Sequence, residues 1–452
     1  MKRIDQGGFF IAKDLPLAEE TRALIIARSL DGIEQLEGRD CREQVERAGL
    51  GKLHHYFPVA KIIDLRVFVM KEARDPLLRM AHAVGRGALG LPDPFYVDDY
   101  TALRFNYPFS IARKGPSDID PPSAGDTIDP AGAEHVVLPT RKRTRIKRLL
   151  QRVAMRLKPP PELPKFDVSA YHKGLPPPAW AHGPHIDTWY GHPATGINLW
   201  WSITGTCEDN SLVFYPDLYG TDVEADPRSM FVKEGFTMTV PHKLVLQDGE
   251  GLLFNGEALH STHLNVSDLT RVAFTTRICR ELPTFLPGRN PGVGSGAWHR
   301  SEDLGQGLTR RVISFPKADR LVPRPEYRRA PRRSETRRHL QVEQKLGDNG
   351  PVRVCASAEL QPSAMMEVRL SNANLLLVRD DTGVHAVAAR CPHVGIKLVD
   401  GTHAAGQLFC PGHGVAFDLA SGKSKCAELS LTVFEASEVD GSVFVAKRPS
   451  AG

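Results

Sequence analysis

The sequence predicts a mainly β protein with helices at its N-terminal end. From Asp14 to about Gly90, apolar residues recur at helical spacing, as in ETRALIIARSLDGIEQL. From Gly196 to Ile278, short apolar or alternating runs such as GINLWWSI, GLLFNG and RVAFTTRI are separated by turn residues, which is typical of a β barrel or sandwich. From Val352 onward, runs such as NLLLVRD and SVFVAK again alternate with turns and predict a second, smaller all-β domain.

The chain has the composition of a globular protein. Its 452 residues are enough for two or three domains, each with a core of ordinary size. The hydrophobic fraction of 41% and the charged fraction of 25% are ordinary, and a net charge of +5 is small for this length. We therefore expect no nucleic-acid partner.

Three features predict a cytoplasmic protein. The N-terminal sequence MKRIDQGGFFIAKDLPL has no apolar run of signal-peptide length. No later segment reaches the roughly 18 apolar residues of a membrane span. The seven cysteines are odd in number and scattered, which argues against a disulfide scaffold and for reduced thiols.

Changes in composition along the chain predict four parts. We expect a mainly helical part over residues 1–94, the larger β domain over 95–309, a charged linker over 310–350, and the small β domain over 351–452. The larger domain also has an insertion near 115–180 that is rich in Pro, Gly and Asp.

We expect one helix inside this insertion. Over residues 140–158, TRKRTRIKRLLQRVAMRLK places its apolar residues on one helical face and Arg and Lys on the rest. Such a helix fits either a solvated helix that packs on its own domain or a peripheral contact with an anionic membrane surface. The sequence leaves both interpretations open.

Two short motifs near the C-terminal end hold cysteine and histidine at metal-ligand spacing. CPH at 391–393 and CPGH at 410–413 each offer one thiolate and one imidazole from a single loop. The four candidate ligands are Cys391, His393, Cys410 and His413. Two histidines on one iron and two cysteines on the other hold the [2Fe-2S] cluster of a Rieske centre. A tetrahedral zinc site is the alternative, although zinc fingers favour C-x2-4-C paired with H-x3-5-H.

From residue 352 to 447 the chain resembles the Rieske ferredoxin-like family, in which hairpins surround two such loops. The resemblance implies a [2Fe-2S] cluster that carries single electrons. Because no flavin or nicotinamide motif is evident, we expect a separate ferredoxin or reductase as electron donor.

The two loops also predict the reduction potential. High-potential members of the family have an extra cysteine in each loop, and a Ser and a Tyr that donate hydrogen bonds to the sulfurs. In this chain those positions hold Ile396, Gly412, Val415 and Phe417. We therefore expect a potential at the lower end of the roughly −150 to +300 mV range of Rieske centres.

The middle of the chain contains a second candidate metal site. In HID, His185 and Asp187 stand two residues apart and so lie on the same side of an extended strand. His260 follows the expected strand GLLFNG and completes a set of two histidines and one carboxylate, which leaves positions on Fe(II) open for a co-substrate and O2. On the next strand Arg271 shares a face with the small Ala273, which leaves room for a guanidinium–carboxylate pair.

In these residues the chain resembles the Fe(II)/2-oxoglutarate-dependent oxygenases, of the phytanoyl-CoA-hydroxylase-like kind, over most of residues 95–280. The resemblance implies a double-stranded β-helix (jelly-roll) domain. It implies catalytic iron ligands at His185, Asp187 and His260. It also implies that Arg271 pairs with the distal carboxylate of 2-oxoglutarate, with Asn198 a weaker candidate for the other end of that molecule.

Several neighbouring residues have more than one interpretation. Trp189 and Tyr190 follow HID and are candidates for the wall of a substrate pocket, with hydrophobic packing as an equal alternative. Other histidines compete for the position of the third ligand, and these are His182, His192 and His263. His263 is the strongest competitor, because it follows the expected ligand by three residues.

The expected function is that of a 2-oxoglutarate-dependent dioxygenase that hydroxylates an unactivated C–H bond. HIDTWYGHPATGINLWWSITGTCEDNSLVFYPDLYG resembles oxygenases that act on sugars and aminocyclitols, including hydroxylases of the lipopolysaccharide sugar Kdo. This implies a polar, sugar-like small molecule or glycolipid as substrate. The Rieske domain would supply electrons that keep the iron reduced. In the alternatives, the cluster replaces 2-oxoglutarate as electron donor, or the protein transfers electrons or senses redox state without catalysis.

Overall fold

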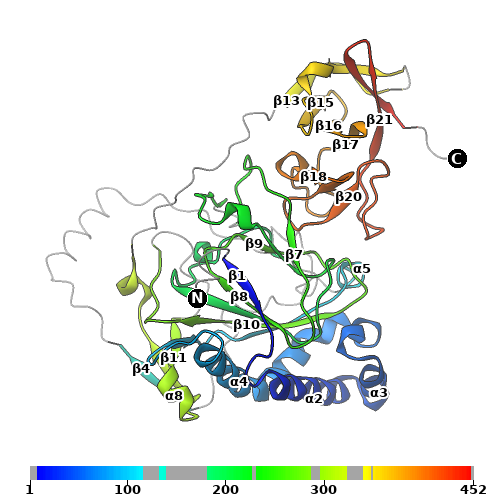
Figure 1. The fold of residues 1–452 in the computed structure, drawn as a ribbon. Helices are drawn as coiled ribbons and strands as arrows, with labels where there is room; N and C mark the ends of the chain where they lie inside the picture. The colour runs from blue at the N-terminus through cyan, green and yellow to red at the C-terminus, as the bar shows by residue number, and fades with distance from the viewer. Residues whose placement is uncertain are drawn as a thin grey trace, which may run out of the picture.

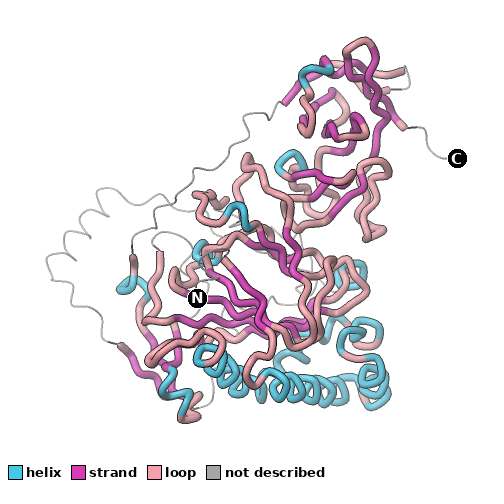
Figure 2. Tube along the Cα trace, viewed as in Figure 1, coloured by secondary structure: helices cyan, strands magenta, loops and turns pink. Residues whose placement is uncertain are grey.

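The computed structural model of the protein describes residues 8–115, 132–138, 181–226, 231–286, 296–322, 339–347 and 350–448 (Figure 1). The chain is mostly β with a few helices, as Figure 2 shows. The expected basic helix at 140–158 lies outside the described residues. Among the helices that are described, none combines the length and the apolar character needed to cross a bilayer.

A layer of helices forms the N-terminal part. The main helices are α2 (Ala18–Glu37), α3 (Arg39–Ala48) and α4 (Ile62–Arg86). Helix α2 begins with Glu19 and Glu20, whose charges are favourable at the positive end of the helix dipole. Helices α2 and α4 approach closely at Gly32, where an added Cβ would lie 2.8 Å from Leu65 Cδ1 and 2.7 Å from Phe68 Cδ1. A residue without a side chain therefore allows this contact.

The helices cover one face of a nine-stranded sheet. Its strands are β1 (Phe9–Ala12), β2 (Tyr96–Asp98), β3 (Ala102–Asn106), β4 (Glu134–Val137), β5 (Gly196–Ser202), β8 (Gly251–Asn255), β10 (Arg271–Cys279), β11 (Ala297–Arg300) and β12 (Arg311–Ser314). Their order is β1-β8-β5-β10-β2-β11-β12-β4, and β3 also pairs with β10. Only the β12–β4 pair is parallel among these pairs.

Along β5 and β10, successive side chains point alternately toward the helices and toward the other face of the sheet. Trp201 pairs with Phe274, and both belong to the core shared with the helices. Trp200, one residue earlier, belongs to a different cluster together with Ala273. The second face of the large sheet is therefore buried against another layer.

That layer is a three-stranded antiparallel sheet in the order β7-β6-β9. Its strands are β6 (Leu212–Phe214), β7 (His242–Leu244) and β9 (His260–Thr262). Phe214 of this sheet packs edge-on against Phe254 of the large sheet, with ring centroids 5.1 Å apart. The run FTMTV at 236–240 is not a strand, although its apolar and polar residues alternate, and β7 begins two residues after it.

A buried ion network ties α4 to the large sheet. Nη2 of Arg74 lies 2.6 Å from Oδ1 of Asp99, and Nε2 of His299 on β11 lies 2.7 Å from the same oxygen. Burial acts to raise the pKa of Asp99, but His299 and Arg74 overcome it and hold the pKa below its ordinary value. The carboxylate is thus ionised and paired inside the protein.

The C-terminal domain has two further sheets. The seven-stranded sheet has the order β13-β15-β16-β17-β21-β22-β14 and the small one β18-β19-β20. The strands are β13 (His339–Val342), β14 (Val352–Ala356), β15 (Met365–Leu370), β16 (Asn374–Asp380), β17 (Gly383–Ala388), β18 (Thr402–Ala404), β19 (Gln407–Phe409), β20 (Ala416–Asp418), β21 (Val433–Val439) and β22 (Ser442–Lys447). All seven cysteines lie in described residues and are free of disulfides.

The structure differs from the expected linker at 310–350. Residues at its start form β12, which pairs with β11 and β4 in the large sheet. Residues near its end form β13, which pairs with β15 in the C-terminal domain. Both strands are only four residues long in an Arg-rich segment, so their apolar pattern is too short to identify them in the sequence.

Candidate functional site

The two loops that bear cysteine and histidine share one backbone pattern. In the first loop, after β17, the amide of Cys391 donates to the carbonyl of Ile396, and the amide of Gly395 donates to the carbonyl of Cys391, both at 2.9 Å. The loop that begins at Cys410, between β19 and β20, repeats both bonds at 2.9 and 3.2 Å. Each loop therefore holds its cysteine at the base of a closed turn.

The four expected cluster ligands lie together as two pairs. Nδ1 of His393 lies 3.2 Å from Nδ1 of His413. The thiol of Cys391 is hydrogen-bonded to Cys410, and this contact raises its pKa well above the ordinary value. Two nitrogens on one side and two sulfurs on the other match the two different irons of a Rieske cluster.

A single tetrahedral ion does not fit this arrangement. Among the described residues, two sets gather three or more potential ligand atoms within 4.8 Å of one another, and the four loop residues are not one of them. The donor set therefore fits a binuclear cluster better than the alternative zinc site.

The surroundings of the sulfurs are mainly apolar. The amide of Gly412 donates to Sγ of Cys410 at 3.4 Å. A Cβ on Gly412 would overlap with Cδ1 of Ile396, so these two positions face each other across the loops. Val415 and Phe417 are buried and offer no side-chain donor. This apolar environment agrees with the expected low reduction potential, which stays a prediction.

His185, Asp187 and His260 converge on one point. Oδ1 of Asp187 lies 3.6 Å from Nε2 of His185 and 3.8 Å from Nε2 of His260. His185 forms an isolated β-bridge with His260, and Asp187 opens the 3-10 turn η4 (Asp187–Tyr190). The pair thus converges through a bridge followed by a turn, whereas the sequence predicted a regular strand.

Backbone carbonyls orient both imidazoles. Nδ1 of His185 lies 2.7 Å from the carbonyl oxygen of Gly183, and Nδ1 of His260 lies 2.9 Å from that of Ala258. When Nδ1–H donates to a carbonyl, Nε2 carries the lone pair, so both rings direct a ligand atom toward Asp187. Burial, and then His185, lower the pKa of His260 to about 4. The imidazole is therefore neutral at pH 7, as a metal ligand must be.

Arg277 is a site residue to which sequence reasoning assigned no role. It lies on β10, and its Nη2 is 3.3 Å from Oδ2 of Asp187. Burial acts to raise the pKa of Asp187, but Arg277, followed by His185, overcomes it and holds the pKa well below the ordinary value. Its position on the same face of β10 as Arg271 was the only signal in the sequence.

Arg271 is a buried cation on the inner face of β10. It is 5% exposed, and burial, followed by Arg104, lowers its pKa to about 10. Its Nη1 donates to the carbonyl of Asn210 at 2.5 Å, and its guanidinium lies 5.9 Å from the ring centroid of Trp200. Within the described part of the chain it forms no ion pair, so a carboxylate of a ligand would complete its partners.

Asn198 lies on the inner face of β5. It is 2% exposed, and neither atom of its amide has a hydrogen-bond partner among the described residues. It is registered opposite Arg277 on β10, whereas Arg271 is registered opposite Asn106 of β3. Asn198 is therefore on the side of the triad and available to a polar ligand.

Trp189 and Tyr190 are both buried in a hydrophobic cluster with Val213 and Phe236. The ring of Tyr190 lies edge-on to that of His185, with centroids 5.1 Å apart. Tyr190 therefore borders the triad, and the role of Trp189 in a substrate pocket stays a prediction.

The competing histidines are placed differently. The ring centroid of His182 lies 5.8 Å from that of His185, outside the triad. His192 is buried near Arg277, which together with burial holds its pKa well below the ordinary value. His263 is 1% exposed and uses Nδ1 on the carbonyl of Leu264 at 2.5 Å.

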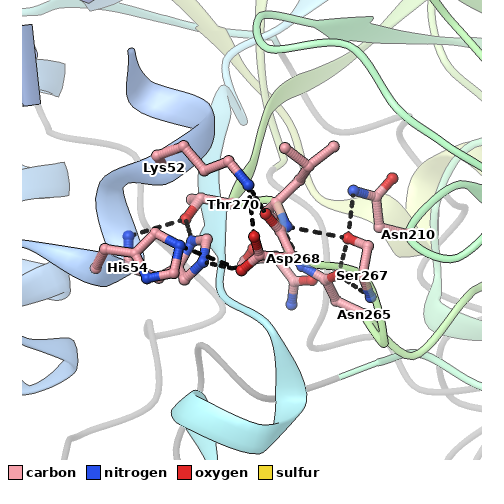
Figure 3. Close-up of polar contacts among 10 residues, drawn as sticks. Lys52, His54, Asn210, Asn265, Ser267, Asp268 and Thr270 are labelled. Carbon is pink, nitrogen blue, oxygen red and sulfur yellow. Dashed lines mark hydrogen bonds and ion pairs between the residues drawn. The ribbon is translucent and has the colours of Figure 1, made fainter. Parts of the chain in front are cut away.

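A second set of potential ligands lies near the surface (Figure 3). Nε2 of His54 and Nε2 of His55 lie 3.0 and 3.2 Å from Oδ1 of Asp268. Nζ of Lys52 already lies 2.6 Å from the other carboxylate oxygen, and Thr270 contacts Nδ1 of His54 at 2.9 Å. Because a lysine neutralises the carboxylate, we interpret this cluster as a contact that fixes the η1 turn (Leu50–His55) to the loop after β9.

Comparisons with known proteins concern the C-terminal domain. Residues 350–434 match the family model of the Rieske [2Fe-2S] domain. The chain is 33% identical over 99 residues to Ferredoxin CarAc of Metapseudomonas resinovorans, which covers 21% of this chain and 92% of that ferredoxin.

A longer protein and a solved structure are also similar to a fifth or so of this chain. The chain is 34% identical over 96 residues to human Apoptosis-inducing factor 3, over 19% of this chain, and spans only 16% of that protein's length. Among solved structures, the complex of reduced oxygenase and oxidized ferredoxin in carbazole 1,9a-dioxygenase contains a chain that is 30% identical, with 23% of this chain and 97% of that chain covered and a TM-score of 0.21.

Proposed function

The chain belongs to the Rieske [2Fe-2S] family through its C-terminal domain, and on this premise we propose that it is an Fe(II)/2-oxoglutarate-dependent dioxygenase with an attached electron-transfer domain. The cluster is held by Cys391, His393, Cys410 and His413. The oxygenase site is on the inner side of the two facing sheets, which together make the proposed double-stranded β-helix. A protein that carries a Rieske cluster and an oxygenase site is an oxidoreductase.

One observation carries the oxygenase part of the proposal. His185, Asp187 and His260 bring two imidazole nitrogens and one ionised carboxylate oxygen within 4.8 Å of one another, and all three residues are buried. Two histidines and one carboxylate are the donor set that non-heme Fe(II) oxygenases use. When bound there, iron supplies a site at which O2 is activated.

The co-substrate assignment is supported by the charge of the inner face. Arg271 has no anionic partner among the described residues, and Asn198 has an unsatisfied amide on the side of the triad. A dicarboxylate such as 2-oxoglutarate can pair one carboxylate with a buried guanidinium while its other end lies at the metal. The sugar-like substrate follows only from the resemblance of residues 185–220 to oxygenases of sugars.

The Rieske domain is proposed to keep the mononuclear iron in the Fe(II) state. Reduction of O2 takes four electrons, of which decarboxylation of 2-oxoglutarate supplies two and the substrate C–H bond two. The domain would therefore not be needed in each turnover. It would supply one electron to reduce the iron back to Fe(II) whenever the iron has been oxidised to Fe(III). The donor to the domain is a separate ferredoxin or reductase.

The decisive experiment uses anaerobically purified full-length protein. We expect acid-labile sulfide and iron of one [2Fe-2S] cluster, plus one further iron whose visible spectrum changes when 2-oxoglutarate is added. With O2 and 2-oxoglutarate, slow release of succinate and CO2 should follow without any external electron donor.

Two results would replace the proposal. Turnover that needs an external electron donor and ignores 2-oxoglutarate would indicate an oxygenase in which the cluster is the electron source. A protein that holds the cluster but neither binds a further iron nor releases succinate would indicate an electron carrier or redox sensor.

A further inference from the structure

The C-terminal domain contacts the outer face of the β7-β6-β9 sheet, and the contact involves a cluster loop. Gly414, next to His413, has a φ of +70°, and a Cβ there would lie 3.1 Å from Cδ2 of His263 and 3.4 Å from Cγ2 of Val213. The absence of a side chain lets the backbone of this loop lie directly on the sheet. In Figure 1 the C-terminal domain accordingly lies beside β7 and β9, away from α2 and α3.

The triad is on the other side of the same two strands. Val213 of β6 is registered opposite Ser261 of β9, and Phe214 is registered opposite His260. Registered pairs point to one face and successive residues to opposite faces. The ring of Phe214 stacks on His260 at 5.6 Å on the inner side, so the loop at Gly414 lies on the outer side. A single layer of backbone therefore separates the two candidate sites.

A hydrogen bond joins this layer to a candidate cluster ligand. The amide of Leu264 donates to the carbonyl oxygen of His413 at 3.2 Å. Leu264 follows His260 by four residues, which span at most about 14 Å even when fully extended. His413 is 1% exposed, so the contact is closed to water.

Charged and polar contacts surround this point. Nζ of Lys397 lies 2.9 Å from Oε2 of Glu234, and Nζ of Lys425 lies 2.7 Å from Oδ2 of Asp209. Further contacts are the amide of Met238 on the carbonyl of Asp400 at 3.2 Å, the amide of Gly235 on Oδ2 of Asp400 at 3.3 Å, and the ring of Phe109 against that of His393 at 4.9 Å. In these two ion pairs the C-terminal domain gives the lysine and the rest of the chain the carboxylate, whereas the pair of Arg113 with Glu428 at 3.6 Å has the opposite polarity.

We propose that this interface is a permanent part of the folded protein, and that β9 with His263 and Leu264 is the connection through which the triad and the cluster loops affect each other. The proposal deepens the proposed function and rests on it, because it concerns the same two sites. The C-terminal domain is then fixed on the outer side of the sheet that carries His260, and one chain suffices to bring the two sites together.

The main test measures whether the two sites sense each other in the full-length protein. The cluster is reduced anaerobically, and its EPR signal is recorded with Mn(II) or with diamagnetic Zn(II) added to the triad. We expect faster relaxation of the cluster signal with Mn(II) than with Zn(II). His260→Ala should abolish the difference, because it removes a ligand of the added ion.

Charge reversal of the interface provides the matched variants. Glu234→Lys with Asp209→Lys replaces both ion pairs by repulsion, and Glu20→Lys with Glu43→Lys makes the same charge change on exposed helix residues. The interface variant should lose most of the Mn(II) effect while it keeps its cluster spectrum and Mn(II) binding. The helix variant should behave like the unmodified protein.

Amide hydrogen exchange tests the interface without any metal. The amide of Leu264 should be protected in the unmodified protein and in the helix variant, and should exchange at least about tenfold faster in the interface variant. Equal exchange in all three, or Mn(II) bound at the triad without any effect on the cluster, would overturn the proposal. Failure of the unmodified protein to bind Mn(II) at all would instead overturn the proposed function, and the exchange of Leu264 would still decide whether the domains are docked.

Discussion

Nε2 of His260 lies 3.8 Å from Oδ1 of Asp187, although the two residues come from different elements, β9 and the turn η4. Both side chains are buried and in the protonation state that a divalent metal needs at pH 7. The distance leaves space for an ion between them, which makes the triad the part of the oxygenase proposal that can be tested most directly.

Removal of a triad ligand should release the mononuclear metal alone. His260→Ala is expected to weaken Mn(II) binding by at least about 100-fold, since even the loss of outer contacts to a ligand costs 10–100-fold. The visible spectrum of the cluster should not change. Metal titration followed by calorimetry measures the affinity, and His182→Ala is the matched control. Loss of binding in the control, with retention in His260→Ala, would show that the ligand assignment is wrong.

Arg271 should determine the affinity for 2-oxoglutarate. Arg271→Gln removes a charged partner of a carboxylate worth about 1.5–3 kcal/mol, so the dissociation constant should rise roughly 10–100-fold. Arg271→Lys keeps the charge but loses the forked geometry and should show a smaller increase. Binding is measured with Mn(II) at the triad, and Arg300→Gln on the exposed side of β11 serves as control. An unchanged dissociation constant in Arg271→Gln would exclude this role.

The cluster should gain potential when a hydrogen-bond donor is added near its sulfurs. Phe417→Tyr or Val415→Ser is expected to raise the reduction potential by about 60 mV if the new bond is worth about 1.4 kcal/mol more in the reduced state. Spectroelectrochemistry of the full-length protein measures the change. Phe444→Tyr, on β22 and outside the cluster loops, should leave the potential unchanged.

Asp99 should make a large contribution to stability. Asp99→Asn removes the buried carboxylate that pairs with Arg74 and His299 and is expected to lower the free energy of unfolding by about 3–5 kcal/mol, as for other broken buried ion pairs. Asp75→Asn removes the exposed partner of the same arginine and should cost less than about 1 kcal/mol. Urea unfolding at pH 7 measures both differences.

The difference in unfolding free energy between Asp99→Asn and the unmodified protein should depend on pH in a definite direction. Because the pKa of Asp99 is lowered in the folded state, its ionisation stabilises the protein at pH values above the ordinary value of 3.8. That contribution is lost as the pH falls below 3.8 through the folded-state pKa. The difference in unfolding free energy between the two proteins should therefore be constant from pH 7 to about pH 5 and become smaller only below that pH. A gap that changes between pH 7 and 6 would point to another group.

The cluster loops could be predicted from the sequence because their chemistry is local. Cys391 and His393 share one closed turn, as do Cys410 and His413, so spacing alone constrains which atoms can meet. The Rieske domain expected from these motifs is confirmed by the family comparison.

Other features depend on packing between distant residues and left no pattern in the sequence. Arg277 on β10 contacts Asp187 of η4, although the two residues are 90 positions apart in the sequence. His263 was weighed as a metal ligand, whereas the structure places it against Gly414 of the other domain. The strand β12 has too few residues for a period, and pairing with β11 defines it. Such contacts become visible only when the chain is folded.

The burial of His413 restricts how a redox partner can approach this protein. Leu264, just after the strand that carries His260, contacts that histidine, whereas Pro392 is exposed and the neighbouring His393, whose ring lies against Phe109, is half-buried. On the proposed function, a ferredoxin or reductase would therefore approach the cluster over the Pro392 side. Electrons would then enter at one edge of the domain while the opposite edge contacts the rest of the chain, so the proposed transfer would run in one direction.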